Sequence, residues 1–293
     1  MIRSNSRSSS LLAVDLGGTK TLIAIYDWDG QLIQRCKRRY LSTEWPSIEA
    51  MLCDFIETVP SSIDLPRTGC IAVAGRVQDG EARITNLPWI LQEQTICKAS
   101  GIENVELIND FSVLIFGLPF LQANQKVDIQ RGHEGLPKEG PIAIIGAGTG
   151  LGIARGVLTR QGLISLPSEG GHSEFAPRSD IEWQLANWLK ENLQIERLSL
   201  ERIVSGTGLG HIANWRLSQN DALSHPLRPY AKDWRRGFSE KNSVPDLPAL
   251  ASQSASRGDP FMQEVLRLWL SAYGSAAGDL ALQDLCTGGL WLG

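Results

Sequence analysis

The chain opens with short apolar runs that predict three strands. Residues 11–14 and 21–26 flank a glycine turn, and Asp29 with Gly30 forms a hairpin signal before residues 31–40. Consecutive strands joined by such short connections pair in antiparallel fashion. We therefore expect an antiparallel meander at the start of a domain.

Helices alternate with strands after this meander. Pro46 starts a segment in which the apolar residues from Ile48 to Val59 recur at helical spacing. Buried strands are predicted over residues 69–74 and 105–109, with a helix over residues 89–99 between them. This order of elements is typical of an α/β domain.

The same arrangement starts again in the second half of the chain. Residues 141–146 read as a strand, residues 147–150 as a glycine turn and residues 151–158 as a returning strand. A unit that recurs after so many residues does not indicate a solenoid. It predicts two related domains that face each other.

A capping signal predicts the next helix. Ser179 is followed three residues later by Glu182, the spacing of a capping box. Four residues are predicted on the apolar side of this helix: Ile181, Leu185, Trp188 and Leu189.

A polar, proline-containing segment over residues 219–248 is predicted to be a surface loop. Asp259 and Pro260 then provide an N-cap and a first helical residue, and the helix is expected to run to about Leu285. Gly274 and Gly278 share one face of it, where small residues would allow close packing.

Composition restricts the class of protein. The 293 residues are 42% hydrophobic and 20% charged, with a formal net charge of −4. This balance suits a globular chain with a substantial core and argues against nucleic acid as a partner. An anionic substrate would need local positive groups or a metal ion.

Cysteine content and the N-terminus indicate a cytoplasmic protein. The five cysteines are odd in number and form no C-x-x-C pair, which suits free thiols in a reducing compartment. Residues 1–10 are rich in serine and are expected to be a disordered tail. The apolar stretches are too short for a signal peptide or a membrane span.

The first glycine turn is a candidate phosphate site. Gly17, Gly18 and Thr19 expose consecutive backbone N–H groups, and such groups bind anionic oxygens. Asp15 precedes them and could orient Mg²⁺ through water. The alternative is an ordinary hairpin whose glycines only satisfy positive φ. Lys20 is next to the turn, but strand alternation points it away from Thr19, so a surface role is equally compatible.

A second glycine turn strengthens the phosphate interpretation. Gly148, Thr149 and Gly150 lie in a second strand–turn–strand unit, and two such turns can bind one phosphate chain from both sides. Neither turn has the Gly-Lys-Ser/Thr of a P-loop. A dinucleotide fingerprint is not favoured, because a strand rather than a helix follows Gly150.

Five motifs in this order resemble those of bacterial glucokinases, which belong to the actin-like ATPase superfamily. The resemblance covers the chain from about residue 11 to its end. The motifs are Asp15-Leu16-Gly17-Gly18-Thr19, Leu107-Ile108-Asn109-Asp110-Phe111, Gly146 to Gly152, Glu169-Gly170-Gly171-His172 and Glu201-Arg202-Ile203-Val204-Ser205-Gly206.

This resemblance implies a two-domain, actin-like ATPase (ribonuclease H-like) α/β fold with a cleft between the domains. A small domain would cover residues 11–109 and a large domain residues 110–293. The family transfers the γ-phosphoryl group of ATP, with Mg²⁺, to the 6-hydroxyl of glucose in the first step of glycolysis. Its members are commonly homodimers.

The resemblance also assigns roles to single residues. Asp110 matches the general base, and the sugar contacts match Asn109, Asp110, Glu169, His172 and Glu201, with Asn86 as a further candidate. Each has a structural alternative. Asp110 could only cap the helix that begins near Phe111, His172 could be structural, and Glu201 could be a solvated helix residue. A zinc site at Glu169 and His172 is not favoured, since no second histidine or cysteine is near.

The chain departs from the family pattern at two places. Arg76 stands where the family has proline, which leaves the loop less rigid. Gly288 and Gly289, expected to bind the nucleotide, start a strand that stops at Gly293, so the C-terminal part of the fold is expected to be missing.

Other functions stay open at this level. A non-catalytic sugar-binding protein, or an inactive remnant of a sugar kinase, is the alternative that the chain end suggests. A kinase for another sugar would keep the mechanism and change the acceptor. A sugar-sensing repressor is not favoured, because no basic helix-turn-helix segment precedes Leu11.

Overall fold

The computed structural model describes residues 9–28, 32–84, 87–132, 140–237 and 246–293. The chain divides into two compact units, Met1–Phe120 and Leu121–Gly293. The domain boundary predicted after residue 109 stays a prediction.

Unit 1 is built on a five-stranded mixed sheet in the order β3-β2-β1-β4-β8. The predicted meander is present, because β1 pairs with β2 and β2 with β3 in antiparallel fashion. β4 and β8 then join in parallel. The bounds are β1 Ser9–Leu16, β2 Lys20–Trp28, β3 Leu32–Leu41, β4 Thr68–Val73 and β8 Asn104–Asn109.

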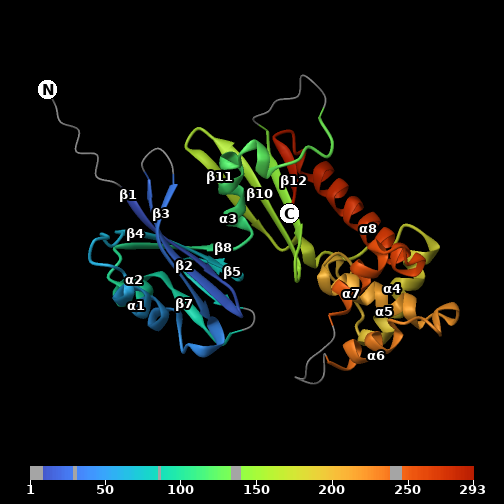
Figure 1. The fold of residues 1–293 in the computed structure, drawn as a ribbon. Helices are drawn as coiled ribbons and strands as arrows, with labels where there is room; N and C mark the ends of the chain where they lie inside the picture. The colour runs from blue at the N-terminus through green and yellow to red at the C-terminus, as the bar shows by residue number, and fades with distance from the viewer. Residues whose placement is uncertain (1–8, 29–31, 85–86, 133–139, 238–245) are drawn as a thin grey trace. The chain divides into compact units, whose positions relative to one another are not determined.

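Helices α1 (Ile48–Thr58) and α2 (Glu93–Ser100) pack beside each other in this unit (Figure 1). The side chain of Ser47 accepts a hydrogen bond from Ala50 N, so α1 begins at Ile48, two residues after the predicted start at Pro46. Met51, Leu52 and other apolar residues of α1 are fully buried against the sheet. The predicted apolar face of this helix is therefore confirmed in its main part.

The helix predicted over residues 89–99 is wrong in its first part. Ile90–Gln92 forms strand β7, and α2 begins only at Glu93. β7 pairs with β6 (Glu81–Ile84), which pairs with β5 (Gly75–Gln78), in a small antiparallel sheet. The adjacent apolar residues Ile90 and Leu91 are compatible with the spacing of a helix and with that of a strand. Their segment forms a strand because it pairs with β6.

Unit 2 contains a four-stranded sheet in the order β11-β10-β9-β12. The predicted strand–turn–strand unit is β9 (Ile142–Ala147) with β10 (Leu151–Thr159), paired in antiparallel fashion. β11 (Gly162–Ser168) extends it, and β12 (Gly289–Leu292) joins β9 in parallel. The strand predicted near the chain end is therefore confirmed.

Helices α4, α5 and α7 of unit 2 gather at one end of the long helix α8 (Figure 1). Their bounds are α4 Asp180–Leu193, α5 Gly206–Ser218, α6 Arg228–Gly237, α7 Leu247–Ser256 and α8 Pro260–Asp284. The prediction of a loop over residues 219–248 is wrong for residues 228–237, which form α6, and for residues 247–248, where α7 begins. Pro229 and Pro248 lie in the first turns of these helices, where proline is tolerated.

Two predictions for single helix residues also need correction. Ile181, expected on the apolar side of α4, is 44% exposed, whereas Leu185 and Leu189 are buried as predicted. Gly274 and Gly278 are exposed on α8, and an added Cβ at either would meet nothing within 4 Å. These glycines therefore do not serve close packing between described residues.

Among the described residues, no helix combines the length and the apolar character that a membrane span requires. All five cysteines lie in the described segments and are free thiols.

Candidate active site

The first glycine turn connects β1 to β2. Gly17 N donates to Lys20 O at 3.1 Å, and a Cβ on Gly17 would lie only 2.9 Å from the same oxygen. Only glycine fits there without a shift of the backbone. Asp15 is exposed near the end of β1.

Ser42 supports this turn from the end of β3, a contact that the sequence did not reveal. Its hydroxyl donates to Gly17 O at 2.7 Å, and its backbone N donates to Thr19 O at 2.9 Å. Thr21 Oγ1 lies 2.9 Å from Ser42 Oγ. Because Ser42 uses its one proton on Gly17, Thr21 is the donor in that pair. Both hydroxyls are fully buried, so the turn has a fixed, satisfied support.

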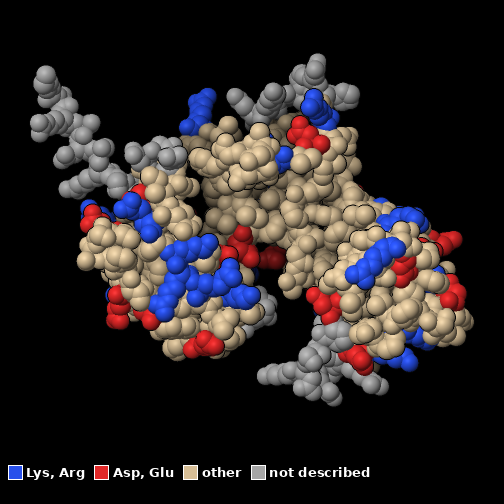
Figure 2. All heavy atoms as spheres, in the orientation of Figure 1, with Lys and Arg blue, Asp and Glu red and all other residues tan. Residues whose placement is uncertain are grey.

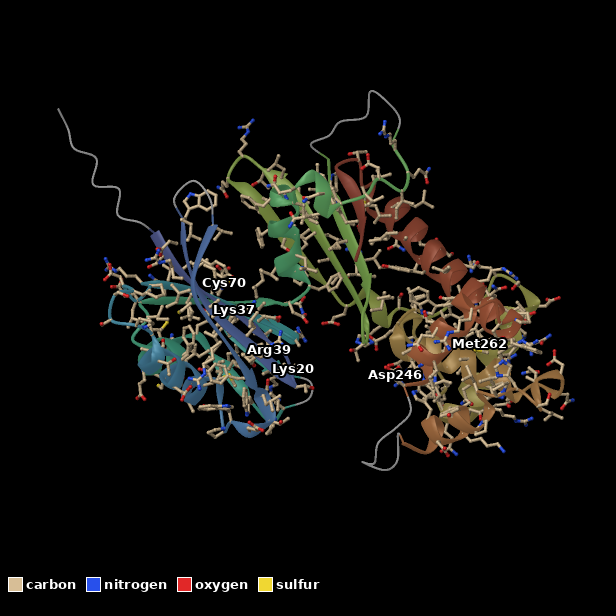
Figure 3. All side chains as sticks on the ribbon, viewed as in Figure 1. Lys20, Lys37, Arg39, Cys70, Asp246 and Met262 are labelled. Carbon is tan, nitrogen blue, oxygen red and sulfur yellow. The ribbon has the colours of Figure 1, made fainter. Side chains whose placement is uncertain are left out.

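Lys20 belongs to a basic surface rather than to the inside of the turn. Figure 2 shows Lys and Arg side chains gathered on this side of unit 1, and Figure 3 labels Lys20, Lys37 and Arg39 among them. The register of β2 against β3 places Lys37 and Arg39 opposite Ala24 and Leu22, on the face that Lys20 shares. Lys20 is exposed, while the adjacent Thr21 is buried, as strand alternation predicts.

Asn109 and Asp110 follow the end of β8. Asp110 N donates to Val73 O at 3.0 Å, which continues the parallel pairing with β4. Asn109 Oδ1 accepts hydrogen bonds from Phe111 N and Ser112 N, both at 3.0 Å, where α3 (Ser112–Gly117) begins. Asn109 therefore accepts hydrogen bonds from the backbone where α3 begins, and the capping alternative for Asp110 stays a prediction.

The second glycine turn forms hydrogen bonds with the first residues of α5 and with the segment that precedes this helix. Gly206 N donates to Gly148 O at 2.8 Å, and Thr207 Oγ1 donates to Thr149 O at 3.3 Å. Leu151 N donates to Glu201 Oε2 at 3.0 Å. The predicted sugar residue Glu201 thus contacts the predicted phosphate turn directly.

The second glycine turn and the start of α5 share a pentapeptide. Residues 148–152 and 206–210 have the same sequence, Gly-Thr-Gly-Leu-Gly. The first copy is a turn that enters β10, whereas the second forms the start of α5, with Ser205 as its N-cap. The Ser205 hydroxyl accepts from Gly208 N at 2.8 Å and caps α5. The same five residues therefore form a turn in one place and the start of a capped helix in the other.

Glu169 precedes the short 3₁₀ turn η4 (Gly170–His172), and His172 is its last residue. His172 Nε2 lies 3.8 Å from Glu169 Oε2, and both side chains are more than half exposed. A Cβ on Gly171 would lie 2.1 Å from Leu151 O, so this glycine allows η4 to approach the second turn. Leu200 N donates to Ser173 O at 2.7 Å, which joins this segment to the one that carries Glu201. Glu169, His172 and Glu201 thus lie on neighbouring segments of unit 2.

Gly288 and Gly289 lie where β12 begins. Gly288 N donates to Pro141 O at 3.0 Å, and a Cβ on Gly288 would lie 2.3 Å from Gly140 O. Gly289 has φ of 130° and starts β12. Both glycines are needed for the backbone that joins β12 to β9. Asn86 lies outside the described residues.

No three His, Cys, Asp or Glu side chains of the described segments are grouped to hold a metal ion. The exposed carboxylate of Asp15 beside the first turn still fits an ion bound through water, because Mg²⁺ prefers oxygen donors and keeps several waters.

The mixed sheets and their glycine turns define an α/β fold of the actin-like sugar-kinase class. The crystal structure of glucokinase from an Antarctic psychrotroph matches with a TM-score of 0.74 and 29% identity, covering 97% of this chain and 82% of that one. The crystal structure of glucokinase from Balamuthia mandrillaris in complex with glucose matches with a TM-score of 0.72 and 19% identity, covering 99% and 80%. At the latter identity, the likeness concerns the fold alone.

A model of the glucokinase family matches residues 12–293. The glucokinase of Nostoc punctiforme is 36% identical over 289 residues, which is 96% of this chain and 83% of that relative. This chain belongs to the glucokinase family. The family expected from the five sequence motifs is confirmed, while the predicted cleft and the predicted loss of a C-terminal part stay predictions.

Proposed function

We propose that this chain is an ATP-dependent hexose kinase that transfers the γ-phosphoryl group to the 6-hydroxyl of glucose. The observation that carries this proposal is the family match over residues 12–293. Two glycine turns with fixed supports, at Gly17 and at Gly148 to Gly150, agree with a polyphosphate substrate. The non-catalytic alternative is not favoured.

Asp110 is proposed as the general base. Phosphoryl transfer to an alcohol needs a carboxylate that accepts the proton of the attacking hydroxyl. The hydrogen bond from Asp110 N to Val73 O fixes this residue at the end of two parallel strands. A base on such a rigid element keeps its position when the substrate binds.

Sugar recognition is proposed for Asn109, Asp110, Glu169, His172 and Glu201, with Asn86 as a further candidate. A site of this kind must pair each sugar hydroxyl, because a buried unpaired group costs about 1–3 kcal/mol. The exposed pair Glu169 and His172 offers an acceptor and a ring nitrogen on one turn. Glu201 offers a further carboxylate, beside those of Asp110 and Glu169.

Nucleotide binding is proposed for Gly17, Gly18, Thr19, Gly148, Thr149, Gly150, Gly288 and Gly289. The backbone N–H groups of Thr149 and Gly150 are the donors that phosphate oxygens require. The N–H groups of Gly17, Gly288 and Gly289 donate to Lys20, Pro141 and Cys286, so these glycines would contribute by the close approach that they allow. Mg²⁺, when bound near Asp15, would neutralise charge on the phosphates. A cytoplasmic location and a homodimer complete the proposal, and the five free thiols suit a reducing compartment.

The direct test measures ADP formation by the folded, purified chain with MgATP and glucose. We expect turnover that requires both Mg²⁺ and glucose. Mannose, fructose and N-acetylglucosamine in parallel reactions would establish the acceptor. A folded chain that binds glucose in calorimetry but forms no ADP would contradict the proposal.

A further inference from the structure

The carboxylate of Glu201 and the second glycine turn form one unit. Leu151 N donates to Glu201 Oε2 at 3.0 Å, across 50 residues of sequence. A Cβ on Gly150 would lie 2.4 Å from that same oxygen. The turn therefore has a glycine at the position where the carboxylate of Glu201 approaches.

The backbone of Glu201 is also fixed. Ser205 Oγ donates to Glu201 O at 2.7 Å while it caps α5 by accepting from Gly208 N. Trp269 Nε1 donates to Ser205 O at 2.9 Å from α8. The carboxylate thus reaches the turn from a segment that the helical core of unit 2 holds in place.

The turn leaves donors available for an anion. The carbonyl oxygens of Gly148 and Thr149 accept hydrogen bonds from Gly206 N and Thr207 Oγ1. No described residue accepts a hydrogen bond from the N–H groups of Thr149 and Gly150. The carbonyl groups of the turn accept hydrogen bonds from α5, while the N–H groups of Thr149 and Gly150 are available to donate to a phosphate.

Glu201 has acceptor capacity beyond Leu151. A carboxylate accepts about four hydrogen bonds, and the contact with Leu151 uses one position on Oε2. Oε1 is left for a sugar hydroxyl. A hydroxyl that donates to Oε1 would fix the carboxylate and draw part of its negative charge away from the neighbouring phosphate site.

We infer that Glu201 is a positioning residue for the second phosphate turn, so that sugar and nucleotide share one carboxylate and each strengthens the binding of the other. This inference rests on the proposed function. It assigns to Glu201 a task that a residue acting only as a sugar ligand would not have.

Hydrogen exchange tests the structural half without any ligand. Glu201→Ala should make the Leu151 amide exchange about fivefold to tenfold faster, because one hydrogen bond is lost. Glu201→Gln keeps an acceptor oxygen and should stay near the wild-type rate. Glu191→Ala, at an exposed position of α4, is the matched control. Equal exchange in Glu201→Ala and wild type would overturn the inference.

Calorimetry with a non-hydrolysable MgATP analogue tests the functional half. Without sugar, Glu201→Ala should raise the dissociation constant about fivefold to tenfold, whereas Glu201→Gln and Glu191→Ala should stay within about twofold of wild type. Saturating glucose should lower the wild-type constant at least about fivefold, and Glu201→Ala should lose that effect.

The two kinds of failure are distinguishable. A wild-type chain that phosphorylates glucose, with unchanged analogue affinity in Glu201→Ala, overturns this inference alone. Tighter analogue binding in Glu201→Ala also overturns it, because charge repulsion would then outweigh positioning. A wild-type chain that binds no analogue overturns both the inference and the proposed function.

Discussion

Asn109 Nδ2 donates a hydrogen bond to the backbone oxygen of Gly75 at 3.0 Å. Its Oδ1 accepts from the N–H groups of Phe111 and Ser112. A carboxamide has two N–H donors and two acceptor positions, so these contacts use both acceptor positions and one of the two donors. The residue beside the proposed base therefore joins the end of β8, the start of β5 and the start of α3.

Asn109→Asp should destabilise unit 1 although it keeps the acceptor oxygens. The new carboxylate loses the donor and faces the oxygen of Gly75, which should lower the free energy of unfolding by about 1–3 kcal/mol. Urea unfolding followed by circular dichroism would measure this. The matched control is Asn104→Asp, at the exposed start of the same strand, and equal losses in both variants would contradict the prediction.

Asp110→Asn should reduce kcat by at least about 10²-fold, because an amide cannot accept the proton of the sugar hydroxyl. The KM for glucose should change much less, since the amide still forms hydrogen bonds. Steady-state assays at saturating MgATP would show this split. Asp64→Asn, at an exposed position of unit 1, provides the charge control. A near-normal kcat would remove Asp110 from the role of base.

Local patterns predicted those elements whose ends carry a chemical signal. Asp259 and Pro260 fixed the start of α8, and strand alternation with glycines found β1, β2, β9 and β10. The pattern failed where apolar residues fit two periods, as at Ile90 and Leu91. It also failed where Pro229 was read as a loop marker although it lies in the first turn of α6.

In the candidate site too, features formed by neighbouring residues could be predicted from the sequence, whereas contacts between distant residues could not. Both glycine turns and Asn109-Asp110 can be recognised from neighbouring residues in the sequence. The supports of the turns cannot, because Ser42 lies 25 residues from Gly17 and Glu201 lies 50 residues from Leu151. Such contacts depend on how strands and helices pack, and single residues at those positions carry no pattern.

His211 should make the protein less stable in mild acid. Burial, and secondly the positive charge of Arg202, lower the pKa of His211 to about 4. The unfolded chain binds this proton near pH 6.5, so stability is complete above that pH and falls as the pH drops toward 4. Between pH 7 and pH 5, the loss from this group should be about 2 kcal/mol.

Urea unfolding of wild type and His211→Gln at pH 7 and pH 5 isolates this contribution, because other titrating groups contribute equally to both proteins. We expect the wild type to lose about 2 kcal/mol more than the variant over this interval. Parallel losses in the two proteins would mean that the pKa of His211 is close to its ordinary value.

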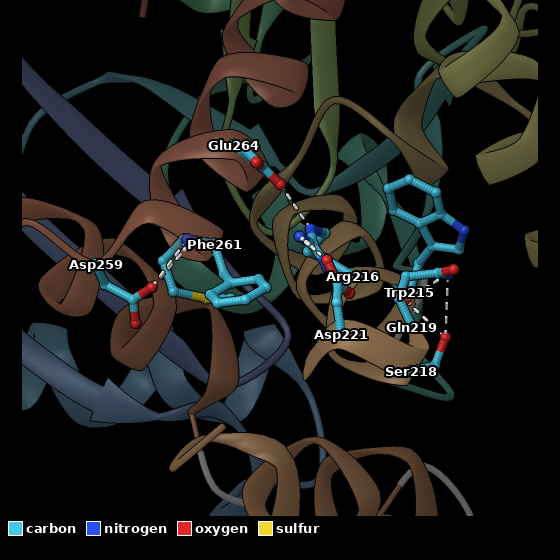
Figure 4. Close-up of polar contacts among 9 residues, drawn as sticks. Trp215, Arg216, Ser218, Gln219, Asp221, Asp259, Phe261 and Glu264 are labelled. Carbon is cyan, nitrogen blue, oxygen red and sulfur yellow. Dashed lines mark hydrogen bonds and ion pairs between the residues drawn. The ribbon is translucent and has the colours of Figure 1, made fainter. Parts of the chain in front are cut away.

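Arg216 should not tolerate replacement by lysine. Its guanidinium binds both carboxylate oxygens of Asp221, at 2.8 and 2.9 Å, and Nε donates to Glu264 at 2.6 Å (Figure 4). It also lies 4.3 Å from the ring centre of Phe261. Lysine cannot reproduce this fork, so Arg216→Lys should lower the free energy of unfolding by about 1–3 kcal/mol. Chemical unfolding beside the exposed control Arg257→Lys would measure it, and equal stability of the two variants would refute the prediction.

Helix α8 should become more stable when its exposed glycines are replaced. An alanine Cβ at Gly274 or Gly278 meets nothing within 4 Å, and alanine restricts the unfolded chain more than glycine does. Each change should raise the free energy of unfolding by about 0.5–1 kcal/mol. Gly210→Ala, inside α5, is the contrasting control, because its Cβ would lie 2.4 Å from the ring of Trp234. Thermal unfolding should therefore show a higher Tm for Gly274→Ala and Gly278→Ala and a lower Tm for Gly210→Ala. A lower Tm for either α8 variant would mean that these glycines have a packing role after all.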